Sequence, residues 1–135
     1  MSGQTDLSRL LASLEPELLA GEFVFATMPE ETVPKFLALR PIGMFLEAEG
    51  ATLILPKHAV DGSGILASAP FRCITMNVHS SLEAVGMTAA MAAALTEAGI
   101  SANVVAAYYH DHVFVPAADA EQAVAVLQGL SDRFK

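Results

Sequence analysis

An order of predicted elements that occurs twice along the chain constrains the fold most. In the second half, apolar stretches rich in β-branched residues predict strands at residues 71–78, 102–108 and 112–115. One helix is expected between the first two strands, from about residue 80, and another after Asp119. The second half is therefore predicted to run strand, helix, strand, strand, helix.

The first half is predicted to follow the same order with shorter helices. Strands are expected at residues 22–28, 42–48 and 51–56. Short helical segments are expected at residues 34–39 and 58–64. The likeness between the halves lies in the order of elements and not in residue identity.

This doubled order is the split βαβ pattern of ferredoxin-like folds. It predicts an α+β chain of two ferredoxin-like βαββαβ modules in tandem, each an antiparallel sheet with helices on one face. The expected boundaries are residues 1–70, for an N-terminal helix and the first module, and residues 71–135 for the second module.

Local signals place the ends of several elements. Leucines at helical spacing predict a first helix that ends near Pro16. Glu49-Gly50 predicts a tight hairpin turn, and Asp111 is expected in a second turn. Ser80-Ser81-Leu82-Glu83 fits a capping box at the start of the helix that carries Met87, Met91 and Leu95.

Composition narrows the functional classes. Hydrophobic residues make up 53% of the 135 residues and the mean hydropathy is +0.48, which argues against intrinsic disorder. The net charge of -8, with scattered basic residues, argues against nucleic-acid and membrane-surface partners. We expect a cytoplasmic protein, because the N-terminus lacks a signal-peptide pattern and Cys73 is the only cysteine.

Three segments of the second half resemble an ACT domain: residues 79–86 (HSSLEAVG), 98–105 (AGISANVV) and 108–116 (YYHDHVFVP). They are similar to small stand-alone tandem ACT proteins of bacteria and to the ACT modules of aspartate kinases and cytosolic arginine sensors. The first half resembles the family only by topology and by a short run at residues 53–56. The resemblance implies a regulatory protein that is not an enzyme, forms a homodimer and binds an amino acid at a seam between modules.

Two polar interruptions of otherwise apolar elements are the candidate ligand site. A helix N-terminus after residue 77 offers free backbone N–H groups for a ligand carboxylate, assisted by a serine hydroxyl. The resemblance implies that the strand after Gly99 meets the ligand's amino group. Alternatively, the serines only cap the helix and Asn103 is structural. The candidate ligand residues are His79, Ser80, Ser81, Leu82, Ser101, Asn103, Val104 and Asp111.

Two other interpretations of the protein's function stay open. The apolar composition also suits a homodimeric interaction module without a ligand. His110 and His112 could bind a metal, although no third ligand is evident. No nucleotide-binding, hydrolase or metalloprotease motif is present, so we expect no catalytic residue and no cofactor. Cys73, inside a predicted strand, is expected to be a small buried hydrophobic residue.

Overall fold

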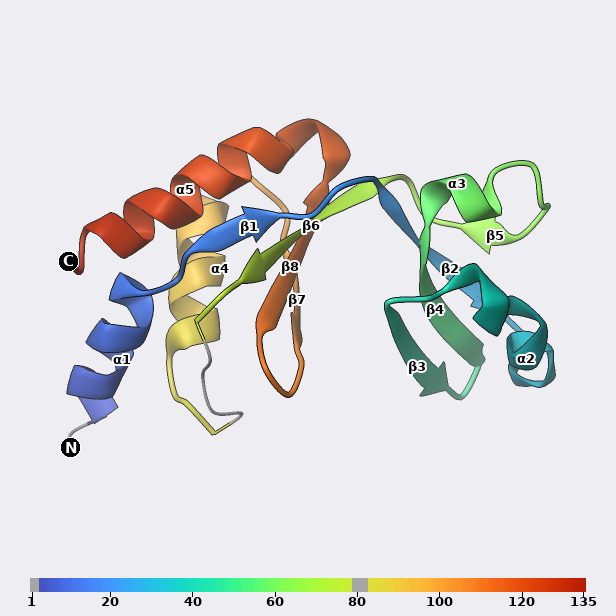
Figure 1. Cartoon of the computed structure of the whole chain (residues 1–135), viewed down its shortest axis with the longest axis horizontal. Coiled ribbons are helices and arrows are strands. Elements are labelled where there is room, and N and C mark those ends of the chain that lie inside the picture. Colours follow the sequence, from blue (N-terminus) through green and yellow to red (C-terminus); the bar gives the residue numbers. More distant parts are fainter. Residues whose placement is uncertain (1–2, 79–82) are drawn as a thin grey trace. The chain divides into compact units, whose positions relative to one another are not determined.

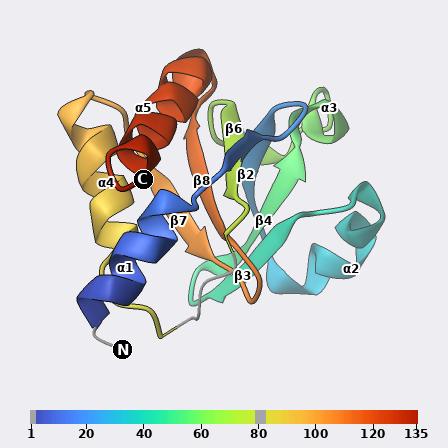
Figure 2. The same ribbon diagram turned by 60° about the vertical axis from the view of Figure 1, so that its left-hand side comes forward.

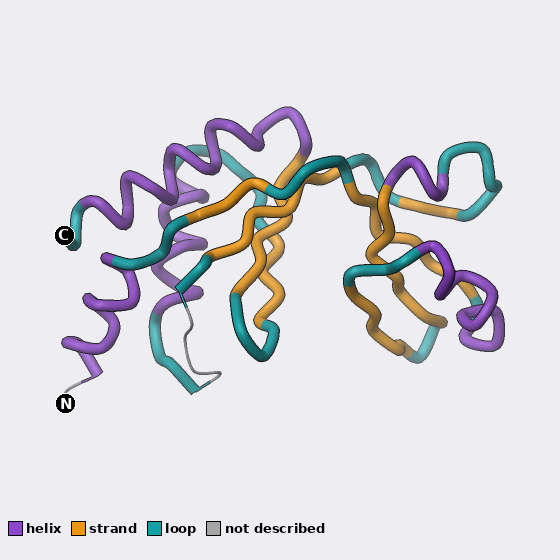
Figure 3. Tube along the Cα trace, viewed as in Figure 1, coloured by secondary structure: helices purple, strands orange, loops and turns teal. Residues whose placement is uncertain are grey.

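The computed structural model of the chain describes residues 3–78 and 83–135 and divides the chain into two compact units (Figure 1). The larger unit combines Met1–Leu19 with Arg72–Lys135, and the smaller unit is Ala20–Phe71. Both units combine strands and helices, as the trace in Figure 3 shows. Each unit is an α+β body with its own hydrophobic core.

The larger unit has four strands and three longer helices. Its sheet has the order β1-β6-β8-β7, in which β1 pairs antiparallel with β6, and β7 pairs antiparallel with β8. The elements are α1 (Gly3–Ala12), β1 (Pro16–Leu18), β6 (Phe71–Met76), α4 (Met87–Glu97), β7 (Asn103–Ala106), β8 (Asp111–Pro116), a 3-10 turn (Ala117–Asp119) and α5 (Ala120–Asp132).

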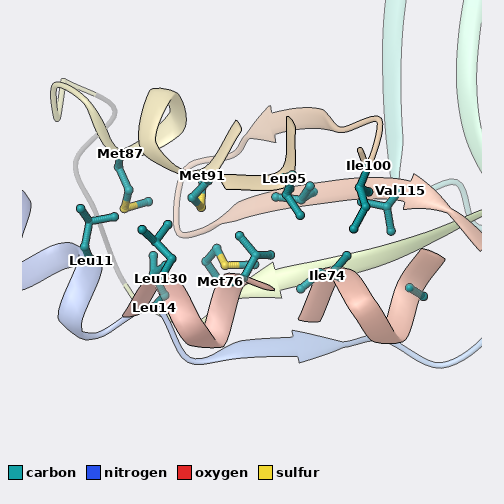
Figure 4. Packing of buried hydrophobic residues seen from close by; sticks show 14 residues of the cluster. Leu11, Leu14, Ile74, Met76, Met87, Met91, Leu95, Ile100, Val115 and Leu130 are labelled. Carbon is teal, nitrogen blue, oxygen red and sulfur yellow. The ribbon is translucent and has the colours of Figure 1, made fainter. Parts of the chain in front are cut away.

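The helices lie on one face of this sheet (Figure 2), and one cluster of buried side chains joins them to it (Figure 4). The methionines and leucine at four-residue spacing on α4 all lie in it, as the helical repeat predicted. The buried members are Leu11, Leu14, Ile74, Met76, Met87, Met91, Leu95, Ile100, Val113, Val115, Ala120, Ala123, Leu127 and Leu130.

The smaller unit repeats the strand order with much shorter helices. Its sheet has the order β3-β4-β2-β5, with every pairing antiparallel. Its core cluster is Val24, Ala26, Met28, Val33, Ala51, Leu53, Leu55 and Val60. The elements are β2 (Phe23–Met28), α2 (Val33–Phe36) between 3-10 turns at Glu30–Thr32 and Leu37–Leu39, β3 (Gly43–Glu47), β4 (Gly50–Pro56), α3 (Lys57–Val60) and β5 (Leu66–Ala67).

The predicted fold class is confirmed, and both units have the strand order of a ferredoxin-like sheet. Each sheet also has the short fourth strand that a βαββαβ module requires, whose residues the sequence patterns did not locate. In the smaller unit this strand is β5, of two residues, and in the larger unit it is β1, of three residues. Strands this short contain too few residues to show an alternating pattern.

The N-terminal segment belongs to the larger unit, although it precedes the smaller one in the chain. β1 pairs with β6, and Leu11 and Leu14 are buried in the core of the larger unit. The two compact units therefore have different bounds from the two predicted modules, residues 1–70 and 71–135. The boundary between sequence modules near residue 70 stays a prediction.

The first hairpin turn lies one residue earlier than predicted. Ala48 and Glu49 form the turn, and Gly50 is the first residue of β4, with a φ of 149°. A Cβ at Gly50 would lie 2.7 Å from the carbonyl oxygen of Met28. The glycine is therefore needed for close approach between β4 and β2 as well as for its backbone conformation.

The predicted capping box is wrong, because α4 begins later than expected. Its N-cap is Gly86, which has a φ of 98°, and its first residue is Met87. A helix cannot continue through a residue in this left-handed conformation, so Glu83 is not in the first turn of α4. Ser80, Ser81 and Leu82 lie outside the described residues.

Candidate functional site

Two histidines join the hairpin of β7 and β8 to the end of β6. His112 Nδ1 lies 2.9 Å from the hydroxyl of Thr75, in the neighbouring strand β6. His110 Nδ1 lies 3.4 Å from the carbonyl oxygen of Val78, to which it donates a hydrogen bond. The two contacts align the start of β8 with the end of β6.

Asp111 lies between these histidines and faces the opposite side of the sheet. Neighbouring residues of a strand point to opposite faces, so Asp111 shares the helix-covered face with Val113, a member of the core. Asp111 is only 7% exposed. Burial raises the pKa of its carboxyl, and the nearby His112 opposes that shift. Among the described residues no hydrogen bond or ion pair to this carboxyl is found, and the nearby His112 compensates its charge only in part.

Asp111 is not the turn residue that the sequence predicted. It is the first residue of β8, opposite Ala106. The turn itself is closed by a hydrogen bond from the N–H of Ala107 to the carbonyl oxygen of His110, at 3.0 Å. A turn aspartate would be solvated, whereas a strand aspartate at this place is buried beneath the helix layer.

The start of α4 supplies free donors at the same end of the larger unit. Gly86 makes no side-chain cap, and the first N–H groups of a helix have no partner within it. In Figure 1 the start of α4 and the turn between β7 and β8 lie at one end of this unit. The buried carboxyl and the helix N-terminus thus offer opposite charges to a ligand at that end.

The helix-free face of the same sheet has a polar row. Glu17 in β1 is opposite Thr75 in β6, and Val105 in β7 is opposite His112 in β8. Burial is the largest cause of the lowered pKa of His112; the charge of His110 acts in the same direction, and that of Asp111 opposes it. The sequence analysis missed Thr75, because a lone threonine in an apolar strand has no signal until the strand pairing is known.

The segment that follows β6 is attached to the N-terminal part of the chain. The side-chain amide of Asn77 donates to the carbonyl oxygen of Glu15, at 3.2 Å, and to Oε1 of Glu17, at 3.1 Å. Asn77 therefore fixes the point at which the predicted ligand loop begins. His79, Ser80, Ser81 and Leu82, the loop residues of the predicted site, lie outside the described residues.

The remaining predicted ligand residues do not gather at one point within the larger unit. Asn103 is exposed and lies opposite Phe114, whereas Asp111 lies opposite Ala106. The two positions are three residues apart along the hairpin, which is about 10 Å along a strand. Ser101 is exposed just before β7, and Val104 packs against the core cluster. Only Asp111 is next to the end of β6.

The structure describes no cluster of three or more histidine, cysteine, aspartate or glutamate residues suited to a metal, within residues 3–78 and 83–135. Cys73 is buried, and burial raises the pKa of its thiol to about 11. The sequence prediction of a small buried hydrophobic residue is confirmed. None of the described helices is long and apolar enough to cross a membrane.

Two surface hollows lie away from the predicted ligand residues. One, of about 470 Å³, lies between α4 and α5 and is lined mainly by small residues, with Glu97 and Arg133 at its sides. The other, of about 310 Å³, is in the smaller unit beside the ion pair of Lys57 and Asp61. Neither includes a carboxyl as buried as that of Asp111, so we place the candidate site at the end of β6.

The fold and this site define a class of protein: two ferredoxin-like modules, with a buried carboxyl at the start of β8 in the larger unit. Two family profiles described as ACT domain match the chain, one over residues 68–129 and one over residues 2–72. The chain therefore belongs to the ACT-domain family, as a tandem ACT protein. A comparison with curated proteins found no match.

Solved structures similar to the chain share its fold. A Vibrio cholerae protein, described as of unknown function and as a possible transport protein, is 48% identical, with a TM-score of 0.86 over 96% of this chain and 99% of that one. The ligand-free regulatory subunit of aspartate kinase from Thermus thermophilus is 15% identical, with a TM-score of 0.59 over 85% of this chain and 96% of that one. An Agrobacterium tumefaciens protein is 16% identical, with a TM-score of 0.71 over 86% and 87% of the two chains.

Proposed function

We propose that this protein is a regulatory protein without catalytic activity that binds a small amino acid at the end of β6 in the larger unit. Membership of the ACT-domain family supports a regulatory, ligand-binding role. The fold that it shares with regulatory subunits of aspartate kinase agrees with that role. The ligand class and the position of the site are our inference from the residues.

The observation that carries the proposal is the buried carboxyl of Asp111. A carboxylate removed from water costs free energy unless a cation or several donors compensate it. Among the described residues Asp111 has no hydrogen-bond donor, burial raises its pKa, and the charge of the nearby His112 opposes that rise only in part. The ammonium group of an amino acid would supply the missing positive charge. Binding of the ammonium group would then offset the free-energy cost of burying the Asp111 carboxylate, so the ligand would stabilise the folded protein.

The ligand's carboxylate has donors at the same end of the unit. Backbone N–H groups at the start of α4 attract an anion, because the helix dipole and the unpaired donors act together. The hydroxyls of Ser80 and Ser81 stay predicted contacts for this carboxylate. The roles of His79, Leu82, Ser101, Asn103 and Val104, and a ligand position at a seam between modules, also stay predictions.

The test measures the melting temperature with each of the twenty common amino acids at millimolar concentration. A ligand at about a hundred times its Kd stabilises the native state by roughly 2.7 kcal/mol. We expect Asp111→Asn to melt at a higher temperature than the wild type without ligand, because it removes a buried charge that is only partly compensated. We expect the same variant to lose the stabilisation by ligand.

Asp119→Asn is the matched control, because Asp119 lies in the same unit and makes no side-chain cap to α5. It should keep the response to ligand. An unchanged Kd in Asp111→Asn would show that Asp111 does not hold the ammonium group. If no amino acid stabilises the wild type and calorimetry detects no binding, the amino-acid-binding function is wrong and an interaction module is favoured.

A further inference from the structure

The N-terminal segment, from α1 to β1, contacts both elements that the proposed ligand site uses. These elements are β6, which ends at Met76, and α4, which begins at Met87. β1 pairs with β6, and Figures 1 and 2 both show α1 beside the start of α4. Two side chains, one at each element, make the contacts that matter for the site.

Asn77, the residue after β6, is bound to the N-terminal segment by its backbone and by its side chain. Its backbone N–H donates to the carbonyl oxygens of Leu14, at 2.9 Å, and Glu15, at 3.3 Å. Its side-chain amide donates to the carbonyl oxygen of Glu15 and to Oε1 of Glu17. Glu15 has a φ of 45°, a conformation that persists in such a residue only where other contacts hold it. The bonds from Asn77 to its carbonyl oxygen are contacts of this kind.

Leu7 of α1 lies against Gly86, the N-cap of α4. A Cβ at Gly86 would have its three nearest atoms in the Leu7 side chain, with Cδ2 at 3.0 Å. The carbonyl oxygen of Gly86 accepts a hydrogen bond of 3.0 Å from the N–H of Ala90, which closes the first turn of α4. Leu7 therefore packs on the residue that determines where α4 begins and where its free N–H groups lie.

We propose that the N-terminal segment controls the affinity of the ligand site through Asn77 and Leu7, which are positioning residues and do not contact the ligand. Asn77 positions the end of β6, and Leu7 positions the start of α4. This proposal rests on the proposed function, because it concerns the affinity of the same site. A site binds a small ligand tightly only when its supporting residues hold its groups at the right spacing, so a displacement of either element weakens binding.

The N-terminal segment is itself anchored in the core of the larger unit. Leu11 and Leu14, which lie in the chain between Leu7 and Glu15, are 2% and 0% exposed. Protein interiors are closely packed, so a displacement of α1 is transmitted to its contacts and not absorbed. The coupling is also reciprocal: if the packing of α1 changes the affinity for the ligand, the ligand stabilises the packing of α1 by the same factor.

The first experiment measures, by calorimetry, the Kd of the amino acid that stabilises the wild type most. We expect Asn77→Ala and Leu7→Ala each to raise this Kd by about tenfold, at a temperature where melting curves show both variants to be folded. Gln128→Ala is the matched control for Asn77→Ala, because the amide of Gln128 donates to Asp132 Oδ1 within α5. Leu10→Ala is the control for Leu7→Ala, because Leu10 is also a partly buried residue of α1 packed on the core. Both controls should keep the wild-type Kd.

The second experiment measures hydrogen exchange and gives a readout that needs no ligand. Leu7→Ala should speed exchange of the Ala90 N–H, whose hydrogen bond closes the first turn of α4, whereas Leu7→Met, which conserves volume, should not. In the wild type, the amino acid should slow exchange within α1. Unchanged exchange at Ala90 in Leu7→Ala overturns the proposal.

The values of Kd separate this proposal from the proposed function. If the wild type binds an amino acid and Asn77→Ala and Leu7→Ala bind it equally well, this proposal is wrong and the proposed function stands. Equal weakening by Gln128→Ala and Leu10→Ala also overturns it, because a general loss of stability would then explain the change. A wild type that binds no amino acid overturns the proposed function and this proposal together.

Discussion

The two units share a strand order but differ in their helices. In the larger unit, α4 and α5 have eleven and thirteen residues, whereas α2 and α3 in the smaller unit have four each. Among the described residues, fourteen buried side chains form the core of the larger unit and eight that of the smaller one. The strand order therefore does not determine how much surface a ferredoxin-like sheet can bury. The helix length determines it.

This difference separates two roles within one chain. Long helices cover one face of the larger sheet so fully that a carboxyl at the start of β8 becomes buried there. Short helices in the smaller unit leave β3 uncovered on both faces. A deep, charged position suits a small ligand, and an exposed apolar edge suits another strand. We connect ligand binding with the first feature.

The largest predicted effect compares a fully buried leucine of each unit. Leu127 of α5 and Leu53 of β4 both have no exposed surface. Truncation to alanine in a core typically costs about 2–5 kcal/mol, and the cost falls where the surroundings can collapse into the cavity. We expect Leu127→Ala to be in the upper part of that range and Leu53→Ala in the lower part, because the smaller core has fewer layers around the cavity.

Urea unfolding of the two variants, with hydrogen exchange to localise the change, measures this difference. Ile54→Val is the control for a small loss of volume in the smaller unit. Ile54 is only 7% exposed, and valine is one methyl group smaller than isoleucine. A larger cost for Leu53→Ala than for Leu127→Ala would contradict the idea that core depth follows helix length.

A second prediction sharpens the description of the smaller unit. Gly50→Ala should destabilise the protein by about 1–3 kcal/mol, because the position has a positive φ and the new Cβ would meet a backbone oxygen. At Gly43 a Cβ would meet the flexible end of the Ile54 side chain, at 2.9 Å, which can move. We expect Gly43→Ala to cost less than Gly50→Ala. Equal melting temperatures would show that β4 can shift away from β2.

The sequence predicted those helices and strands whose apolar residues follow a repeated spacing. Strands of five or more residues and the buried stripe of α4 follow from the spacing of apolar residues, and both are present. The short strands β1 and β5 have no such pattern, and the pairing of β1 with β6 depends on contacts distant in the chain. The start of α4 was misplaced because Ser80 and Glu83 fit a capping box, whereas the backbone of Gly86 ends any earlier helix.

The candidate site was harder to predict than the fold. Asp111 was expected in a turn because aspartate favours turns, and its burial depends on helices elsewhere in the chain. The contact between Thr75 and His112 depends on which strands are neighbours. Residue types can suggest which groups bind a ligand. Only the strand register shows that Asn103 and Asp111 are at different ends of one hairpin.

The smallest predicted effect concerns pH and distinguishes the two units. Burial lowers the pKa of His112 below its usual value of 6.5, so the unfolded chain takes up a proton before the folded chain does. Stability from this group is present above about pH 6.5 and is lost as the pH falls toward the folded-state pKa. Asp111 acts in the opposite direction, because its raised pKa makes the folded state gain stability as the pH falls through that value.

Urea unfolding between pH 5 and pH 7.5 separates these contributions. Replacing the titrating ring in His112→Gln should flatten the fall in stability below pH 6.5. His58→Gln is the matched control, because His58 is an exposed residue of α3 in the smaller unit. It should leave the pH dependence as in the wild type. If His58→Gln flattens the curve and His112→Gln does not, the pH response belongs to the smaller unit, and the buried polar positions of the larger unit are not its source.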